Sequence, residues 1–217
     1  AALLASEAWL QPALTKKPPR GQMNIVCALP LYHIFALTAC FLLAMRAGGV
    51  NLLIPNPRDM PGFIKELMKY QVNSFPAVNT LYNGLMHHPD FKKLDFSKLK
   101  ISNGGGMAVQ RPVAEQWKAV TGCFIAEGYG LSETSPVASF SVLREEPRVG
   151  SIGRPIPGVK MKLINDDWSD VPHDPEAIGE IAIKGHNVMK GYHGRPRATA
   201  EAIQDGWFRT GDLARKD

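Results

Sequence analysis

Short apolar runs alternate with longer amphipathic segments from Met23 to Gly130. The apolar runs have the length of strands, whereas the segments between them repeat apolar residues with the spacing of one helical face. The predicted strands are Met23–Leu29, Val50–Ile54, Val72–Val78, Leu99–Ser102 and Cys123–Ala126. The predicted helices are Ile34–Ala47, Pro61–Tyr70, Thr80–His87 and Val109–Thr121. We therefore expect an α/β fold with a mostly parallel sheet flanked by helices.

The pattern changes after Pro136, where short apolar runs are separated by turn residues and helix becomes scarce. The predicted strands here are Val137–Val142, Lys160–Ile164, Gly179–Ile183 and Trp207–Thr210, and the predicted helix is Pro196–Ile203. This texture predicts a smaller β-rich, barrel-like subdomain. The chain thus divides into an N-terminal helix remnant with a linker (1–22), an α/β subdomain (23–138) and a β-rich subdomain (139–217).

Composition and charge exclude several classes of protein. The 217 residues include 25 basic and 20 acidic ones, and the resulting charge of +5 is too small and too dispersed to indicate nucleic-acid binding. Cys27, Cys40 and Cys123 occur singly in apolar runs, which argues for a reducing compartment rather than a disulfide framework. The longest apolar stretch, Ile34–Met45, is shorter than the ~20 residues that cross a bilayer, so we expect a soluble protein.

Two polar, glycine-rich segments directly follow predicted strands. Asn103–Gly106 follows Leu99–Ser102, and Glu127–Pro136 follows Cys123–Ala126. Because ligands of parallel α/β sheets bind at the carboxyl ends of the strands, we expect both segments at one ligand-binding rim.

The second of these segments combines groups that suit a nucleotide and its metal. The ring of Tyr129 can stack on a base, and the glycines beside it let the backbone approach a ligand. The hydroxyl of Ser132 can bond a phosphoryl oxygen, and the carboxylate of Glu133 can hold a hard cation such as magnesium. An ordinary turn at the exit from a sheet is the alternative interpretation.

Three more positions are candidates, each with a structural alternative. Gly104–Gly106 could line a flat ligand such as a purine or form a flexible turn, and Asp212 could bind ribose hydroxyls or cap its own turn. His33 could border a substrate pocket or simply pack. The chain contains no G-x-x-x-x-G-K-[ST] phosphate loop and no G-x-S-x-G nucleophile motif, and its other histidines lack metal-binding spacing.

Four segments in this order resemble the adenylate-forming ligase superfamily: Pro30–His33, Gly104–Gly106, Tyr129–Glu133 and Thr210–Asp212. Within that superfamily the sequence is most similar to bacterial long-chain fatty acyl-CoA synthetases. The segments that carry this closer similarity are Ala28–Thr38, Asn56–Asp59, Val78–Leu81 and Leu94–Ser97. The similarity extends from about Val26 to the end of the chain.

The resemblance implies an adenylate site on the α/β subdomain. Its implied ATP- and AMP-binding residues are Gly104, Gly105, Gly106, Glu127, Gly128, Tyr129, Gly130, Ser132 and Asp212. Tyr129 is expected to stack on adenine, Ser132 to contact the α-phosphate where the family more often has threonine, and Asp212 to bind the ribose. Ser132 and Glu133 are the implied catalytic residues, with Glu133 the metal ligand. The implied substrate-binding residues are His33, Val78 and Asn79.

The implied reaction uses ATP, Mg²⁺ and coenzyme A. A fatty carboxylate attacks the α-phosphorus of ATP to give acyl-adenylate and pyrophosphate, and the coenzyme A thiol then displaces AMP. Catalysis would rest on positioning and on neutralising phosphate charge. Amino-acid-activating members of the superfamily hold the substrate's amino group with an aspartate near the position of His33. This sequence has none there, so the resemblance favours a plain carboxylate substrate.

The resemblance also implies an internal fragment, without the upstream phosphate loop and the C-terminal lid domain, and we expect this piece to be inactive alone. Two alternatives to a long-chain fatty acyl-CoA synthetase within the superfamily are a fatty acyl-AMP ligase and another carboxylate–CoA ligase. An alternative from another class is a non-catalytic nucleotide-binding module. The sequence is compatible with a cytoplasmic protein that associates peripherally with the inner face of a membrane.

Overall fold

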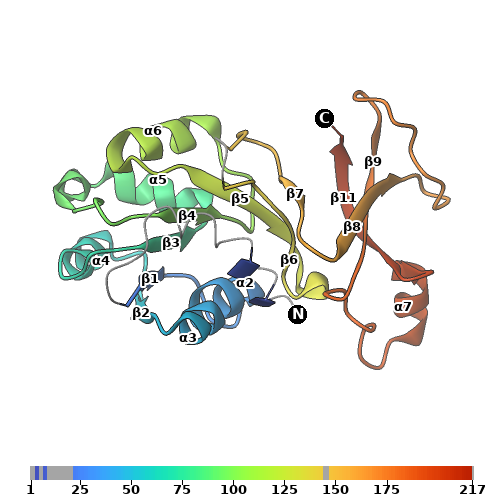
Figure 1. Cartoon of the computed structure of the whole chain (residues 1–217), viewed down its shortest axis with the longest axis horizontal. Helices are drawn as coiled ribbons and strands as arrows, with labels where there is room; N and C mark the ends of the chain where they lie inside the picture. The colour runs from blue at the N-terminus through green and yellow to red at the C-terminus, as the bar shows by residue number, and fades with distance from the viewer. Residues whose placement is uncertain (1–2, 5–6, 9–21, 144–146, 217) are drawn as a thin grey trace.

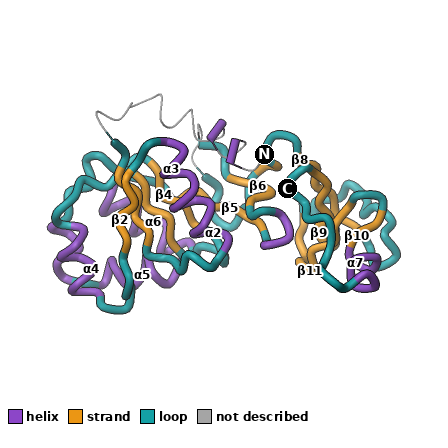
Figure 2. The backbone as a smooth tube through the Cα atoms, turned by 90° about the horizontal axis from the view of Figure 1, so that it is seen from below, coloured by secondary structure: helices purple, strands orange, loops and turns teal. Residues whose placement is uncertain are grey.

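The structure, a computed structural model, describes residues 3–4, 7–8, 22–143 and 147–216 of the chain. It contains a seven-stranded sheet of order β2-β1-β3-β4-β5-β6-β7 and a four-stranded sheet of order β10-β11-β9-β8 (Figure 1). Figure 2 shows the two sheets side by side along the length of the molecule. The prediction of a mostly parallel, helix-flanked sheet followed by a smaller β-rich part is confirmed.

The large sheet is parallel through β5 and antiparallel beyond it. Its strands are β1 (Asn24–Cys27), β2 (Val50–Leu53), β3 (Ser74–Ala77), β4 (Ile101–Gly104), β5 (Ile125–Gly130), β6 (Val137–Phe140) and β7 (Arg154–Pro155). The expected subdomain boundary between residues 138 and 139 falls inside β6, which pairs with β5 and β7. The sheet therefore continues past that point as far as Pro155.

Helices cover both faces of the large sheet (Figure 1). One face carries a continuous helical segment, formed by α2 (Ile34–Ala36), a π-helical turn η1 (Leu37–Leu42) and α3 (Leu43–Ala47). The other carries α4 (Met60–Leu67), α5 (Asn79–His87), the 3₁₀ helix η2 (Pro89–Lys93) and α6 (Arg111–Thr121). Gly48 and Gly122, at φ +64° and +71°, end α3 and α6 in the left-handed conformation that glycine adopts without strain.

The core beneath α5 and α6 is an aromatic cluster centred on Trp117. Its ring centroid lies 4.5 Å from that of Tyr82 and 5.2 Å from that of Phe75. The polar atoms of these two side chains are paired: the indole Nε1 donates to Ser102 Oγ at 2.9 Å, and the Tyr82 hydroxyl donates to the backbone oxygens of Phe75 and Asn103. These bonds fasten the helices to β3 and β4.

The second sheet is entirely antiparallel. It consists of β8 (Val159–Ile164), β9 (Ile178–Gly185), β10 (Ile203–Gln204) and β11 (Trp207–Arg215), with the helix α7 (Pro196–Ala202) beside it. A short 3₁₀ turn, η3 (Ser132–Thr134), connects β5 to β6. None of the residues of α7 is buried, so this helix adds little to the core.

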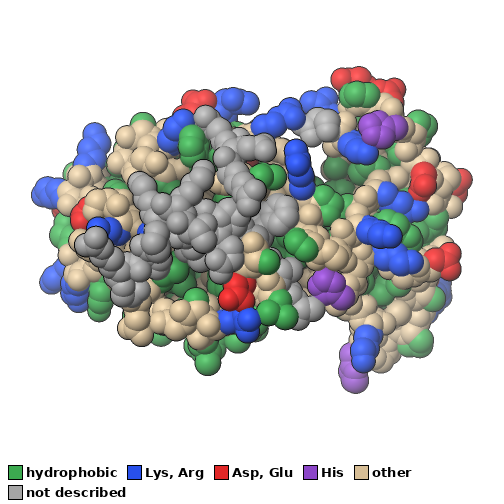
Figure 3. All heavy atoms as spheres, in the orientation of Figure 1, with side chains coloured by type: hydrophobic (Ala, Val, Ile, Leu, Met, Phe, Trp, Pro, Cys, Tyr) green, Lys and Arg blue, Asp and Glu red, His purple; other side chains and the backbone are tan. Residues whose placement is uncertain are grey.

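The N-terminal expectations fall largely on residues outside the described ranges. The predicted linker, Thr15–Gln22, lies outside them except for Gln22, while Leu3–Leu4 and Glu7–Ala8 are helical, as expected of a helix remnant. Within the described residues, every helix is too short or too polar to cross a membrane. Lys and Arg side chains are distributed over the face seen in Figure 3, with acidic side chains between them.

Candidate functional site

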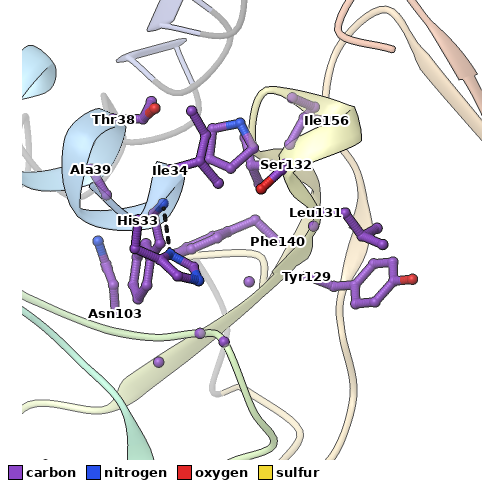
Figure 4. A pocket seen from close by; sticks show the side chains of 18 of the residues that line it. His33, Ile34, Thr38, Ala39, Asn103, Tyr129, Leu131, Ser132, Phe140 and Ile156 are labelled. Carbon is purple, nitrogen blue, oxygen red and sulfur yellow. Dashed lines mark hydrogen bonds between the residues drawn. The ribbon is translucent and has the colours of Figure 1, made fainter. Parts of the chain in front are cut away.

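A cavity of about 220 Å³ lies at the carboxyl ends of β4 and β5, where the ligand-binding rim of a parallel sheet is expected. Its walls come from the β1–α2 loop and the α2–α3 segment, the ends of β4 and β5, and η3 with β6. The residues that line it are His33, Ile34, Phe35, Thr38, Ala39, Leu43, Asn103–Gly106, Gly128–Ser132, Pro136, Val137, Phe140 and Ile156 (Figure 4).

The glycines at the end of β4, Gly104–Gly106, are required by close packing and backbone shape. A Cβ on Gly104 would lie 2.5 Å from Cγ2 of Val109, and one on Gly105 would lie 3.1 Å from the ring of Phe35. Gly106 has φ +76°, which a side chain would strain. The loop can therefore run flat along the cavity, and a flat ligand could lie against its backbone.

Glu127 is buried next to this loop, and its carboxylate is already occupied. One carboxylate oxygen accepts from the backbone N–H of Val109 at 3.1 Å and the other from that of Gly150 at 2.9 Å. The side chain is absent from the cavity lining. Glu127, expected among the nucleotide-binding residues, thus ties two backbone segments to the end of β5.

Tyr129 connects the two sheets through its hydroxyl. The hydroxyl donates to Oδ2 of Asp212 at 2.6 Å, across 83 residues of sequence. Burial raises the pKa of the Tyr129 phenol well above its usual value, and the hydrogen bond to Asp212 raises it further. The phenol therefore stays protonated at any physiological pH, and it holds the Asp212 carboxylate beside the aromatic ring.

The turn η3 carries Ser132 and Glu133 in different directions. Ser132 lines the cavity, whereas the Glu133 carboxylate accepts a hydrogen bond from the Tyr192 hydroxyl at 3.1 Å. The backbone oxygen of Glu133 accepts from the N–H of Met189 at 2.8 Å. Burial and the nearby Glu133 charge raise the pKa of Tyr192. The loop after β9 therefore orients Glu133.

The predicted substrate-binding residues are divided between the cavity and its surroundings. His33 lines the cavity and caps α2, because its Nδ1 accepts from the N–H of Phe35 at 3.2 Å. Val78 and Asn79 begin α5 outside the lining, where Asn79 Oδ1 accepts from the N–H of Gln110 at 2.9 Å. A Cβ on Gly106 would lie 3.6 Å from Cγ1 of Val78, so Val78 borders the glycine loop.

Sequence reasoning missed part of the lining. Phe35 and Thr38 follow His33 on the same helical segment, so their proximity to a recognised motif could have identified them. Asn103 belongs to the segment expected at the rim but was not among the predicted site residues. Phe140 and Ile156 belong to β6 and to the segment after β7. Their contribution depends on the antiparallel end of the sheet, for which the sequence shows no separate signal.

The acidic residues present are compatible with magnesium bound together with phosphate. No group of three His, Cys, Asp or Glu side chains that could hold a metal by itself occurs within the described ranges. Magnesium is commonly held by one or two carboxylates together with substrate phosphates and water, so Glu133, which follows the cavity-lining Ser132 in sequence, fits that role.

Comparisons with known proteins agree with this geometry. The family described as AMP-binding enzyme matches residues 2–193. Over 197 residues the chain is 50% identical to a long-chain-fatty-acid–CoA ligase of Escherichia coli O6:H1 and 34% identical to one of Bacillus subtilis, in each case covering 91% of this chain and 35% of the relative. Its structure matches ATP-bound MatB from Rhodopseudomonas palustris with a TM-score of 0.83 at 25% identity, covering 99% of this chain and 41% of that one. The chain thus spans about a third of the length of these curated relatives.

Proposed function

Since the chain belongs to the AMP-binding enzyme family, we propose that the full-length protein converts a long-chain fatty acid to its acyl-CoA through an acyl-adenylate. The observation that carries the proposal is the single cavity shared by Gly104–Gly106, Tyr129 and Ser132, three motifs well separated in sequence. The 50% identity to a long-chain-fatty-acid–CoA ligase supports this substrate class.

The nucleotide would bind at the end of the cavity marked by Tyr129. Adenine stacks between the Tyr129 ring and the flat glycine backbone, and Asp212 accepts hydrogen bonds from the ribose. The 2.6 Å bond between Tyr129 and Asp212 supports this assignment because it holds the two side chains next to each other before any nucleotide arrives. Glu127 supports the same site from behind by fixing the backbone at Val109.

Ser132 and Glu133 would act on the phosphates. The Ser132 hydroxyl donates to an α-phosphate oxygen, and the Glu133 carboxylate, oriented by Tyr192, is available to hold Mg²⁺. Bound Mg²⁺ supplies charge neutralisation for the triphosphate and the leaving pyrophosphate. The chain itself contributes orientation, which is the main catalytic requirement of phosphoryl and adenylyl transfer.

The fatty acid would enter on the side of His33. A carboxylate oxygen attacks the α-phosphorus, pyrophosphate leaves, and the thiol of coenzyme A later displaces AMP from the acyl carbonyl. The apolar walls from Phe35, Phe140 and Ile156 suit methylene groups. Val78 and Asn79 lie beyond the glycine loop, where they could border a longer acyl path.

We also propose a cytoplasmic location with peripheral contact at the inner face of a membrane. The three cysteines are free and buried, as is typical of a reducing compartment. Fatty acids partition into bilayers, so a peripheral contact would bring the enzyme to its substrate.

Pyrophosphate exchange tests the proposal. The full-length protein, supplied with ATP, Mg²⁺ and a panel of fatty acids, should exchange labelled pyrophosphate into ATP in a fatty-acid-dependent manner. Glu133→Ala should reduce this exchange at least ~100-fold, because the phosphate charge loses its counter-ion.

The matched control is Glu201→Ala on the exposed helix α7, where the Glu201 carboxylate pairs with Arg197 at the surface. This substitution should leave exchange unchanged. Exchange that is equally fast in the Glu133→Ala variant would overturn the metal assignment. Exchange that does not depend on any fatty acid would overturn the proposed substrate class.

A further inference from the structure

Asn103 directs its side chain toward the cavity because of the alternation of strand β4. The neighbouring Ser102 accepts from Trp117 and so faces the α5–α6 layer. Successive side chains of a strand point to opposite faces, so Asn103 faces the α2–α3 segment and lines the cavity there. Figure 4 shows the Asn103 amide nitrogen directed toward the helix that carries Ala39.

The amide of Asn103 is buried without a partner. The residue is 5% exposed, and its Oδ1 is fully enclosed with no hydrogen bond. Its amide nitrogen takes part in no hydrogen bond with the residues that the structure describes. Buried polar side chains are nearly always paired, since an unpaired one keeps its full desolvation cost. The oxygen is enclosed by protein, so the amide nitrogen is the atom that an occupant of the cavity can meet, and it requires a hydrogen-bond acceptor on that occupant.

The position of Asn103 places that polar group on the acyl part of the substrate. In Figure 4, Asn103, Thr38 and Ala39 lie on the opposite side of the cavity from Tyr129 and Leu131, with Ser132 between the two sides. If adenine occupies the Tyr129 end and the α-phosphate lies at Ser132, the Asn103 end receives the substrate carbons. Thr38, buried at 7% exposure, adds a hydroxyl to the same wall.

We propose that Asn103 and Thr38 form a polar subsite for a hydroxyl group on the acyl chain, so that the preferred substrates are hydroxylated fatty acids. This inference rests on the proposed function and narrows its substrate class. A hydroxyl both donates and accepts, so it can accept from the Asn103 amide nitrogen and donate to the Thr38 hydroxyl. It is also uncharged, which suits walls that are otherwise made of Phe35, Phe140 and Ile156.

The size of the cavity restricts the hydroxyl to the start of the chain. About 220 Å³ is below the ~300–1,000 Å³ of pockets that enclose a whole drug-sized ligand. The cavity therefore accommodates only the first carbons beyond the carboxylate, and the hydroxyl belongs on carbon 2 or carbon 3.

Substrate competition tests the inference in the full-length protein. Specificity constants, kcat/KM, are measured from pyrophosphate release with hexadecanoic acid and with its 2-hydroxy and 3-hydroxy derivatives. We expect at least one hydroxy acid to be preferred by about tenfold, the factor that one additional net hydrogen bond supplies. The ratio of kcat/KM for the hydroxy acid to that for hexadecanoic acid should fall to about one or below in Asn103→Leu, which keeps the size of the side chain and removes the amide. Thr38→Val should lower this ratio partway.

Asn51→Leu is the matched control, because Asn51 on β2 also has an unpaired buried Oδ1 but does not line the cavity. The ratio measured for this variant should equal that of the unmutated protein. The unmutated ratio and the Thr38→Val ratio test the inference even where Asn103→Leu fails to fold. Equal or better use of plain hexadecanoic acid by the unmutated protein would overturn the inference, with a bound water then pairing the amide. Activity with none of the three acids would overturn the proposed function itself.

Discussion

The two sheets contribute to the candidate site in different ways. The large sheet presents the glycine loop and Asn103 from strands that are fastened to α5 and α6 by buried aromatic rings and their hydrogen bonds. The small sheet and the loop after β9 contribute Asp212 and Tyr192 through exposed segments, held by hydrogen bonds to Tyr129 and Glu133. Packing therefore sets the shape of the cavity, while a few polar contacts set the position of the groups that reach it from the side.

The difference matters because removing a buried contact and removing an exposed one have different effects on stability. Removing a buried ring leaves a cavity that its neighbours fill only in part, so the stability of the whole sheet falls. Removing an exposed polar contact leaves groups that water can solvate, so the fold survives and only the local geometry changes. Three substitutions separate these effects.

The largest effect is expected for Trp117→Ala. The variant loses the fully buried ring at the centre of the aromatic cluster and leaves the Ser102 hydroxyl without its donor. The free energy of unfolding should fall by about 3–5 kcal/mol. Urea unfolding followed by circular dichroism measures it.

The control for this variant is Trp168→Ala in the loop between β8 and β9 of the small sheet. Trp168 stacks under Arg209 at 5.0 Å and is only partly buried, so its loss should cost about 1 kcal/mol or less. Equal losses for the two tryptophans would contradict the contrast between the sheets.

An intermediate, pH-dependent effect is expected for Glu180→Gln. Glu180 accepts from Arg209 Nε at 2.9 Å and from the N–H of Gly211 at 2.7 Å, next to Asp212. The Arg209 hydrogen bond and, to a smaller degree, that of Gly211 hold the pKa of Glu180 below its usual value, against the opposing effect of burial. The stabilisation is therefore complete above the ordinary carboxyl pKa of ~4.3 and is lost as the pH falls through the lower pKa of the folded state.

At pH 7 the Glu180→Gln variant should lose about 1–2 kcal/mol of unfolding free energy, and its stability should fall less between pH 5 and pH 3 than that of the unmutated chain. Urea midpoints across that range measure both. Asp170→Asn is the control, since its exposed pair with Lys162 should contribute ~0–1 kcal/mol. Identical pH profiles for Glu180→Gln and the unmutated chain would contradict the assignment.

The smallest effect is expected for Tyr129→Phe. The variant keeps the ring that is proposed to stack on adenine and removes the hydroxyl that holds Asp212. Unfolding free energy should change by ~1 kcal/mol or less, whereas the full-length protein should bind ATP about fivefold more weakly because Asp212 is no longer oriented. Calorimetric titration with ATP measures the affinity, and Tyr70→Phe at an exposed position is the control. Unchanged affinity would show that Asp212 needs no orientation by Tyr129.

Much of the fold was predictable because it depends on local pattern. The alternation of apolar runs and amphipathic segments predicted each parallel strand and the helices between them, with boundaries shifted by a few residues. The helical segment Ile34–Ala47 was predicted as a unit, but its π-helical turn was not, since hydrophobic spacing does not distinguish one helical geometry from another. The assignment of β6 to the large sheet also escaped prediction, because pairing with β5 is a long-range choice.

The site was predictable where function requires unusual residue types close together in sequence. The glycines after β4 and the segment Tyr129–Glu133 were recognisable for that reason, and both reach the cavity or its edge. The direction in which each side chain points was not predictable from the sequence. Glu127 and Ser132 lie in the same motif, yet the first bonds buried backbone and the second lines the cavity.

The sequence alone determined the order of strands and helices, the position of the glycine-rich turns at strand ends and the resemblance to adenylate-forming enzymes. All three depend on local spacing and residue type. Only the tertiary structure decided that Tyr129 meets Asp212, that Tyr192 orients Glu133 and that Asn103 lies unpaired in an apolar wall. These contacts join residues far apart in the chain, and their geometry depends on how the sheets and helices pack rather than on any local pattern.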